Sequence, residues 1–267
     1  FGVAAIEPLL QLLIEDEDWE LSWFIARILG DLQHPAALQS LAELVKTAEN
    51  PEVANMAAMA LANHEVNAIS PLTELLHQPS TRLLAVQALA QIHHPEVIVP
   101  LVQVANDPVP EIRAAAIQAL SHFHSAAIAG ILLKALQDPV ALVRQTAVAA
   151  IGLQADMRDD LALSEHLRPL LWDVNLSVCR QTATTLGRIG TAEAIALLSE
   201  VLQSSDAVEL LQIDAVRALG WIDTATTIYQ LQQFLDQQMQ AALPSSFAAA
   251  TPSTVSLEVI SVLGRAE

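Results

Sequence analysis

Six histidines are concentrated where helices are expected to end, and imidazole is both the commonest metal ligand and a frequent proton carrier in proteins. Two imidazoles from successive helix ends could approach one metal ion, as an iron or iron–sulfur carrier would require. However, cysteines and carboxylates are not found at the ligand spacings of structural zinc or iron–sulfur sites. We therefore predict no metal site and no cofactor, and we expect exposed loop positions for all six: His34, His64, His93, His94, His122 and His124.

The single cysteine, Cys179, is the second group that could do chemistry. A catalytic thiol needs a base and a group that orients the base, and no histidine lies near Cys179 in the sequence. We expect a partly buried, inert thiol. One cysteine cannot form an intramolecular disulfide and is typical of a reducing compartment, so we expect a cytoplasmic protein.

Phosphate-binding glycine loops and the H-E-x-x-H metalloprotease motif are missing from the sequence. Carboxylates are frequent but scattered, so that no pair stands out as acid and base. We predict no catalytic residues and no enzymatic activity.

Three arginines, Arg82, Arg113 and Arg144, are spaced 31 residues apart. Such a ladder could hold an acidic partner. Each of the last two also follows a turn aspartate by six residues, Asp107 and Asp138 respectively. We favour a structural role, in which each arginine pairs with that aspartate and charge-assisted hydrogen bonds tie one repeat to the next.

An acidic turn at residues 15–20 lies beside aromatic residues, and aromatic residues are enriched in the energetic centres of protein interfaces. The aromatic residues are Trp19, Trp23 and Phe24. We interpret this segment as the best local candidate for partner binding. The alternative for Trp23 is a place in the hydrophobic core.

These side chains are positioned by an internal repeat of about 31 residues, and internal repeats indicate a solenoid. Each unit starts with a helix that has apolar residues at i, i+3, i+4 and i+7, such as Ile98 and Leu101. A turn with Asp-Pro or Asn-Pro follows and caps an alanine-rich second helix. We expect a small residue, often in a left-handed C-cap, to close each second helix: Gly30, Asn63, Ala90, Ser121, Gly152, Gly187, Gly220 and Gly264.

The last helix pair contains an inserted loop at residues 242–254, with Phe247 as its only large apolar residue. Long loops in compact repeats are functional or disordered, and the sequence does not choose between these two. The terminal segments lack polar capping helices, so we expect the chain to be a fragment of a longer one.

Composition limits the partners. Hydrophobic residues make up 53% and aromatic residues 4%, which favours closely packed helices over sheets. No apolar run is long enough to span a membrane. The net charge of −18 disfavours nucleic acid and anionic membranes, which attract basic proteins, and favours a basic or neutral protein partner.

The segment at residues 138–152, Asp-Pro-Val-Ala-Leu-Val-Arg-Gln-Thr-Ala-Val-Ala-Ala-Ile-Gly, resembles the HEAT-like repeat named after phycobilisome lyases. The segment at residues 18–30 is similar to the aromatic-rich helix of bilin lyases. It keeps one aromatic pair, Trp23 and Phe24, and has Arg27 and Ile28 in place of the second. The resemblance implies a cyanobacterial protein and, as one possible activity, bilin lyase or chaperone action on phycobilisome chromophores.

We therefore predict an all-α protein, a right-handed α-solenoid (superhelix) of about eight HEAT-like helix pairs that forms a single domain over residues 1–267. The leading hypothesis is a non-enzymatic scaffold that binds a protein on its concave surface; a bilin lyase or chaperone and an iron carrier are the alternatives. The candidate binding residues are Trp19, Trp23, Phe24, Gln87, Glu111, Gln118, Gln145, Gln181 and Phe247. The oligomeric state is left open.

Overall fold

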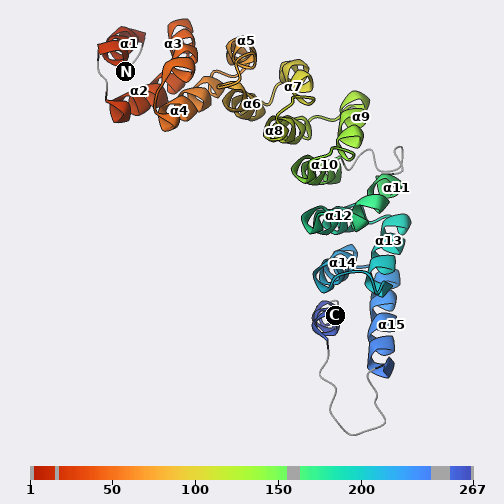
Figure 1. Cartoon of the computed structure of the whole chain (residues 1–267). Helices are drawn as coiled ribbons and strands as arrows, with labels where there is room; N and C mark the ends of the chain where they lie inside the picture. The colour runs from red at the N-terminus through yellow and green to blue at the C-terminus, as the bar shows by residue number, and fades with distance from the viewer. Residues whose placement is uncertain (1–2, 16–17, 155–162, 242–252, 266–267) are drawn as a thin grey trace. The chain divides into compact units, whose positions relative to one another are not determined.

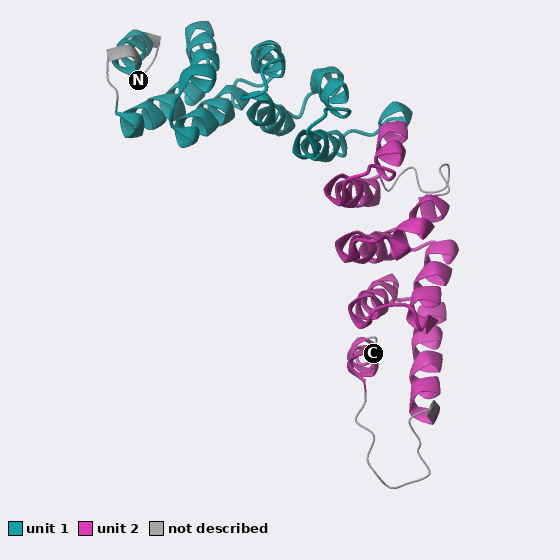
Figure 2. Ribbon diagram, in the orientation of Figure 1, with its two compact units in different colours: residues 1–128 teal, residues 129–267 magenta. Residues whose placement is uncertain are grey.

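A computed structural model of the chain describes residues 3–15, 18–154, 163–241 and 253–265. These residues contain sixteen α-helices and no β-strand, so the all-α prediction is confirmed. The chain divides into two compact units, residues 1–128 and 129–267, with the division inside α9 (Ala126–Ala135) (Figure 2). Each unit is described by itself below, and the single domain over residues 1–267 stays a prediction.

In the first unit the helices alternate between two layers (Figure 1). The second helix of each pair packs against the second helix of the next, α2 on α4, α4 on α6 and α6 on α8. The first helices are α1 (Ile6–Glu15), α3 (Pro35–Thr47), α5 (Val66–Leu75) and α7 (Ile98–Val104), with short 3-10 helices at Val3–Ala5 and Pro95–Val97. The second helices are α2 (Trp19–Asp31), α4 (Pro51–Ala62), α6 (Arg82–Gln91) and α8 (Pro110–Leu120).

The second unit repeats the arrangement, with α10 packed on α12, α12 on α14 and α14 on α16. These second helices are α10 (Ala141–Leu153), α12 (Leu176–Ile189), α14 (Glu209–Ile222) and α16 (Thr254–Leu263). The other layer contains α11 (Leu163–Leu167), which a 3-10 helix continues over Arg168–Trp172, and the longer α13 (Ala192–Gln203) and α15 (Ala225–Ala241) (Figure 1).

Short polar side chains begin the second helices, as the turn sequences predict. The carboxylate of Asp18 and the amide oxygens of Asn50 and Asn175 each accept a hydrogen bond from the backbone N–H two residues ahead, at 2.9 Å. The first N–H groups of a helix have no partner within it, so each cap satisfies one of them. Pro51 and Pro110 occupy first helical positions, where a missing N–H costs nothing.

The small residues near the helix ends match the sequence expectation only in part: Asn63, Ser121 and Gly264 close their helices, but in the right-handed and not the left-handed conformation. Among the described residues, only Gly190 and Asp223 close helices in the left-handed conformation. Gly30 and Gly187 lie inside helices instead. A Cβ atom on either would come within 2.8 Å of the Cβ of Ala60 or Ala218 on the next second helix, so only glycine permits this approach.

Candidate functional site

The first unit uses its ladder arginines to connect successive turns. The Nε of Arg82 donates to the carbonyl of Leu76 at 2.6 Å, and its Nη1 donates to the carboxylate of Asp107 at 2.8 Å. Asp107 in turn accepts from the backbone N–H of Val109, and its carbonyl accepts from the Nη1 of Arg113. One aspartate therefore caps its own turn and receives the arginine of the preceding helix pair.

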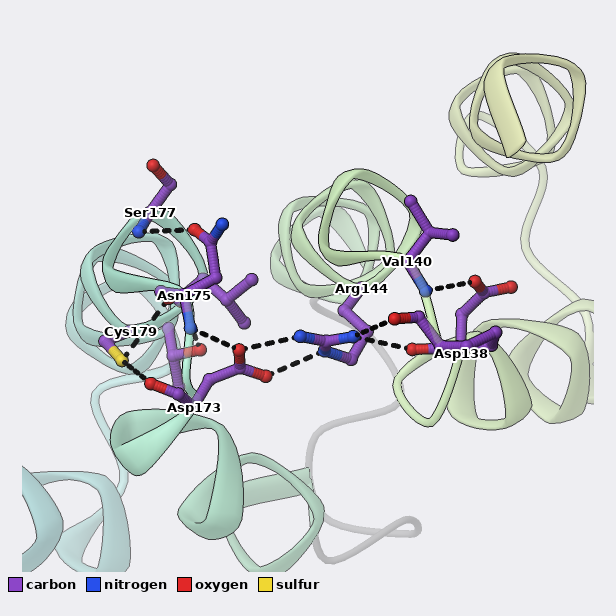
Figure 3. Close-up of polar contacts among 10 residues, drawn as sticks. Asp138, Val140, Arg144, Asp173, Asn175, Ser177 and Cys179 are labelled. Atoms are coloured by element: carbon purple, nitrogen blue, oxygen red, sulfur yellow. Dashed lines mark hydrogen bonds and ion pairs between the residues drawn. The ribbon is translucent and has the colours of Figure 1, made fainter.

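In the second unit, Arg144 makes the same connection through a bidentate contact with a carboxylate (Figure 3). Its Nε and Nη2 donate to the two carboxylate oxygens of Asp173 at 2.7 Å, and its Nη1 donates to the carbonyl of Asp138. Both side chains are largely buried. Hydrogen bonds from Arg144 lower the pKa of Asp173, and the carboxylate raises the pKa of Arg144. Paired, partly desolvated charges of this kind lock two neighbouring helix pairs together.

These contacts differ from the ladder expected from the sequence. Arg113 and Arg144 reach the residues six positions earlier, Asp107 and Asp138, through backbone carbonyls. The carboxylate partner of Arg144 lies 29 residues ahead, and that of Arg82 lies 25 residues ahead. A planar guanidinium offers donors on several edges, so one edge can cap its own turn while another reaches the next.

Cys179 occupies the ladder position on α12, six residues after Asp173. Its thiol donates to the carbonyl of Asp173 at 3.2 Å (Figure 3), and its side chain is buried. Burial raises the pKa of Cys179, so less of the reactive thiolate is present at neutral pH. At the position where other repeats have a ladder arginine, this repeat therefore has a small side chain that is a weak hydrogen-bond donor.

The exposed face of the second helices is the surface that these contacts position. Because the first helices cover one side of each second helix, the opposite side is left to solvent. The close contacts of Gly30 with Ala60 and of Gly187 with Ala218 fix equivalent positions along these helices. Phe24 lies six residues before Gly30. Met56, Leu84 and Ala115 take the corresponding positions on α4, α6 and α8, and the four residues form an apolar row of the first unit.

Two further rows complete what we call the outer face of the first unit. Four residues before Phe24, Met56 and Ala115 is an acidic row, with Glu20, Glu52 and Glu111 in the first helical turns. The row is missing at α6, where the corresponding residue, Ser80, lies in the turn before the helix. Three residues after the apolar row is a mixed row: Arg27, Met59, Gln87 and Gln118. Residues three or four apart share one side of a helix, so the three rows run side by side.

The candidate binding residues of the first unit lie on or beside this face. Gln87, Glu111 and Gln118 are exposed. Phe24 is 53% exposed, and the half-buried Trp23 contacts its ring edge to face, with ring centres 5.1 Å apart. Trp19, at the start of α2, is also exposed. The aromatic pair therefore combines one anchored ring with one available ring.

In the second unit the corresponding face is built from ion pairs. Arg180 on α12 pairs with Asp214 on α14, and Arg217 on α14 pairs with Glu258 on α16 at 2.9 Å. The Arg217 contact lowers the pKa of Glu258. Beside them, Trp221 is 62% exposed and lines a cavity of about 380 Å³ between α14, α15 and α16. The candidates Gln145 and Gln181 are half-buried here, and Phe247 lies outside the described residues.

The histidines make contacts of different kinds, some within one turn and some between helix pairs. His34 and His94 accept backbone hydrogen bonds through Nδ1 at helix starts. His64, contrary to the expected exposure, is buried with its Nε2 3.2 Å from the carbonyl of Leu29. His93 and His122 are exposed with ring centres 6.4 Å apart. Across the described ranges no three histidine, cysteine or carboxylate side chains gather as metal ligands would.

Comparison with known proteins identifies the repeat. A family model of HEAT repeats matches residues 6–82, 69–152 and 164–242. The chain belongs to the HEAT-repeat family. A search of curated proteins finds no match to its sequence.

Solved structures share the α-solenoid fold of the HEAT chain. It is similar to YibA of Escherichia coli, at 20% identity over 97% of this chain and 92% of that one, with a TM-score of 0.60. It is also similar to Kap95p in a complex with RanGDP, at 14% identity over 97% of this chain and 41% of that one, with a TM-score of 0.62. These similarities confirm the α-solenoid; its right-handed sense stays a prediction.

The phycocyanin lyase complex CpcE–CpcF of Nostoc sp. is a more distant neighbour. It aligns over 98% of this chain and 94% of that one at 18% identity, with a TM-score of 0.44. The match supports neither lyase activity nor a cyanobacterial origin for the HEAT chain. No helix in the described parts is both long and apolar enough to cross a membrane.

Sequence reasoning missed several exposed or ion-paired residues of the second helices, above all Met59 in the first unit, and Trp221 and the pair Arg217–Glu258 in the second. The signal was present, because each occupies a fixed register relative to a small residue near the end of its helix. The equivalent positions on successive helices are identified by the contacts that the small residues make with the next helix, and only the folded chain shows these contacts.

Proposed function

We propose that this HEAT-repeat chain is a non-enzymatic scaffold that binds a protein partner on the exposed faces of its second helices. One observation carries the proposal: large apolar side chains stand exposed on these faces in both units. Phe24 and Met59 do so in the first unit, and Trp221 does so beside the ion pairs of the second. Exposed apolar residues that recur on one face of a repeat array are typical of interaction surfaces.

The charge of the chain supports a basic or neutral partner. The sequence has 30 acidic and only 12 basic residues. Several basic residues are engaged within the fold, among them Arg82, Arg144 and Arg217. An acidic surface attracts basic proteins and repels nucleic acid and anionic membranes. The compartment that we propose, on the separate ground of the single cysteine, is the cytoplasm.

The test uses the chain as bait in lysate of the source cells, with the retained proteins identified by mass spectrometry. We expect one partner near equal stoichiometry. Phe24→Asp and Trp221→Asp should each be compared with Val99→Asp, which changes an equally apolar, exposed residue on a first helix. Loss of the partner with a second-helix variant but not with Val99→Asp supports the proposal, whereas equal retention by all three variants contradicts it.

A second candidate function, bilin lyase or chaperone action on phycobilisome chromophores, is favoured by one observation. The pair Trp23–Phe24, which carries the sequence resemblance to bilin lyases, presents an exposed aromatic ring. The purified chain mixed with a free bilin should then shift the visible absorbance of the bilin, and Phe24→Ala should abolish the shift. An unchanged spectrum would remove this candidate. No observation favours an iron or iron–sulfur carrier, and we do not propose one.

A further inference from the structure

The outer face of the first unit has a chemical character of its own. Its apolar row of Phe24, Met56 and Leu84 becomes less exposed along the row, from an open phenyl ring on α2 to half-buried side chains on α4 and α6. Met59 and Ile28 add exposed apolar area beside it. Methionine adapts its shape to different contacts and is common on surfaces that bind helices.

Acidic side chains border this apolar strip. Glu20 and Glu52 lie one turn before Phe24 and Met56, and Asp31 is exposed at the far end of α2. On α2 and α4, which are described in full, Arg27 is the one exposed basic residue. The first unit as a whole has four basic against fifteen acidic residues. A ligand that covers the strip must therefore present positive charge on its flanks.

The spacing of the row sets the shape of that ligand. Neighbouring packed helices lie about 8–10 Å apart, which is also the distance between successive members of the row. An α-helix rises 1.5 Å per residue, so side chains seven residues apart on one helix are separated by about 10.5 Å. A helix lying across α2, α4 and α6 would thus place residues i, i+7 and i+14 over successive members.

We infer that the outer face of the first unit binds a basic amphipathic α-helix of the partner protein. The inference rests on the proposed scaffold function and names the chemistry of its partner. Apolar residues at heptad spacing contact Phe24, Met56 and Leu84, and flanking lysines or arginines face Glu20 and Glu52. Helix-in-groove recognition of this kind draws affinity from a few apolar anchors, while the charges set orientation and specificity.

The test uses a fluorescein-labelled 22-residue peptide with leucine at the first and fourth positions of each heptad and lysine elsewhere. Binding to the full chain is followed by fluorescence anisotropy at physiological salt. We expect saturable, micromolar binding. Two comparison peptides, a scrambled sequence of the same composition and a version with glutamate in place of lysine, should bind at least about tenfold more weakly.

Matched variants locate the site. Phe24→Ala and Glu52→Lys should each weaken binding of the leucine–lysine peptide about tenfold or more, as loss of a central anchor or of its charge partner does. Tyr229→Ala, an equally exposed aromatic residue on α15 of the second unit, should leave binding unchanged. Circular dichroism confirms that each variant stays folded. The inference is overturned if the scrambled peptide binds equally well, or if Tyr229→Ala weakens binding as much as Phe24→Ala.

The outcome is separable from that of the scaffold function. Suppose that the pull-down retains a partner, and that Trp221→Asp releases this partner whereas Phe24→Asp does not. This result would keep the scaffold function and overturn the present inference. Peptide binding at the first unit, lost with Phe24→Ala, supports the inference directly. Failure of both the peptide and the pull-down overturns both.

Discussion

Arg144 joins two helix pairs of the second unit through a single side chain. Its side chain is 12% exposed and that of its partner, Asp173, is 7% exposed, so the pair is shielded from water and salt. Removing one member of such a pair leaves a charge with reduced solvation and no partner, which costs more than the intact pair contributes.

We expect Arg144→Gln to lower the free energy of unfolding by about 2–3 kcal/mol, because Asp173 keeps its charge and loses both charged donors. Arg168→Gln is the matched control, since its pair with Glu200 is more than half exposed on both sides. Exposed pairs contribute about 0–1 kcal/mol. Urea denaturation measures both, and equal losses would contradict the assigned role.

His64 gives the fold a dependence on pH. Burial lowers its pKa below 6.5, and the hydrogen bond to Leu29 only partly offsets this. The unfolded chain therefore binds the proton more readily than the folded one, so stability is fully present above about pH 6.5 and is lost as the pH falls below it.

His64→Gln should flatten this dependence, because an amide can still donate to the carbonyl of Leu29 without titrating. Unfolding free energies at pH 7.5 and pH 5.5 provide the measurement, and His77→Gln, at an exposed position, serves as control. A steeper decline in His64→Gln than in the parent chain would refute the assignment.

At the scale of the element, close packing between second helices requires glycine, which has a hydrogen atom where other residues have a Cβ atom. Gly187 on α12 meets Ala218 on α14 so closely that an added methyl group would lie 2.8 Å from its Cβ. Gly130 on α9 has open space within 4 Å of the same added atom. The same substitution should thus have opposite effects at the two sites.

We expect Gly187→Ala to destabilise the chain by about 1–3 kcal/mol through overpacking, despite the better helix propensity of alanine. Gly130→Ala should instead stabilise it by about 0.5–1 kcal/mol, because alanine lowers the entropy of the unfolded chain. Thermal and urea unfolding of the two variants decide the point. Stabilisation of both would show that the α12–α14 approach is looser than the structure indicates.

Net charge acts at the scale of the whole molecule. With 30 acidic against 12 basic residues, the chain attracts a basic ligand over distances that salt shortens to about 10 Å at 0.1 M. The association rate constant of the leucine–lysine peptide should therefore fall about tenfold or more between 0.05 and 0.5 M salt, with a much smaller change in the dissociation rate. Stopped-flow fluorescence measures both rates, and an association rate independent of salt would exclude electrostatic attraction.

Several features could be predicted from the sequence because they depend on neighbours within one repeat. The turn before α4 is an example: Asn50 caps the helix and Pro51 begins it, as the residue types require. The Trp23–Phe24 helix was selected as a binding candidate, and its structure presents Phe24 to solvent. The binding role of these residues stays a prediction.

Contacts between repeats could not be read in the same way. The exposed position expected for His64 was wrong, because the carbonyl that covers it belongs to Leu29, 35 residues earlier. The aspartate expected to pair with Arg144 was Asp138, whereas the carboxylate that it contacts is that of Asp173. Both errors arise where one helix pair completes the surroundings of another.

The sequence by itself determined that this chain is an all-α repeat protein, because the period of its apolar and small residues decides which helix faces must be buried. The tertiary structure alone decided which residues of the second helices remain exposed, and which carboxylate each ladder arginine receives. The physical reason is that these depend on how closely neighbouring helices approach. That distance is set by pairs such as Gly30–Ala60, whose members come from different repeats.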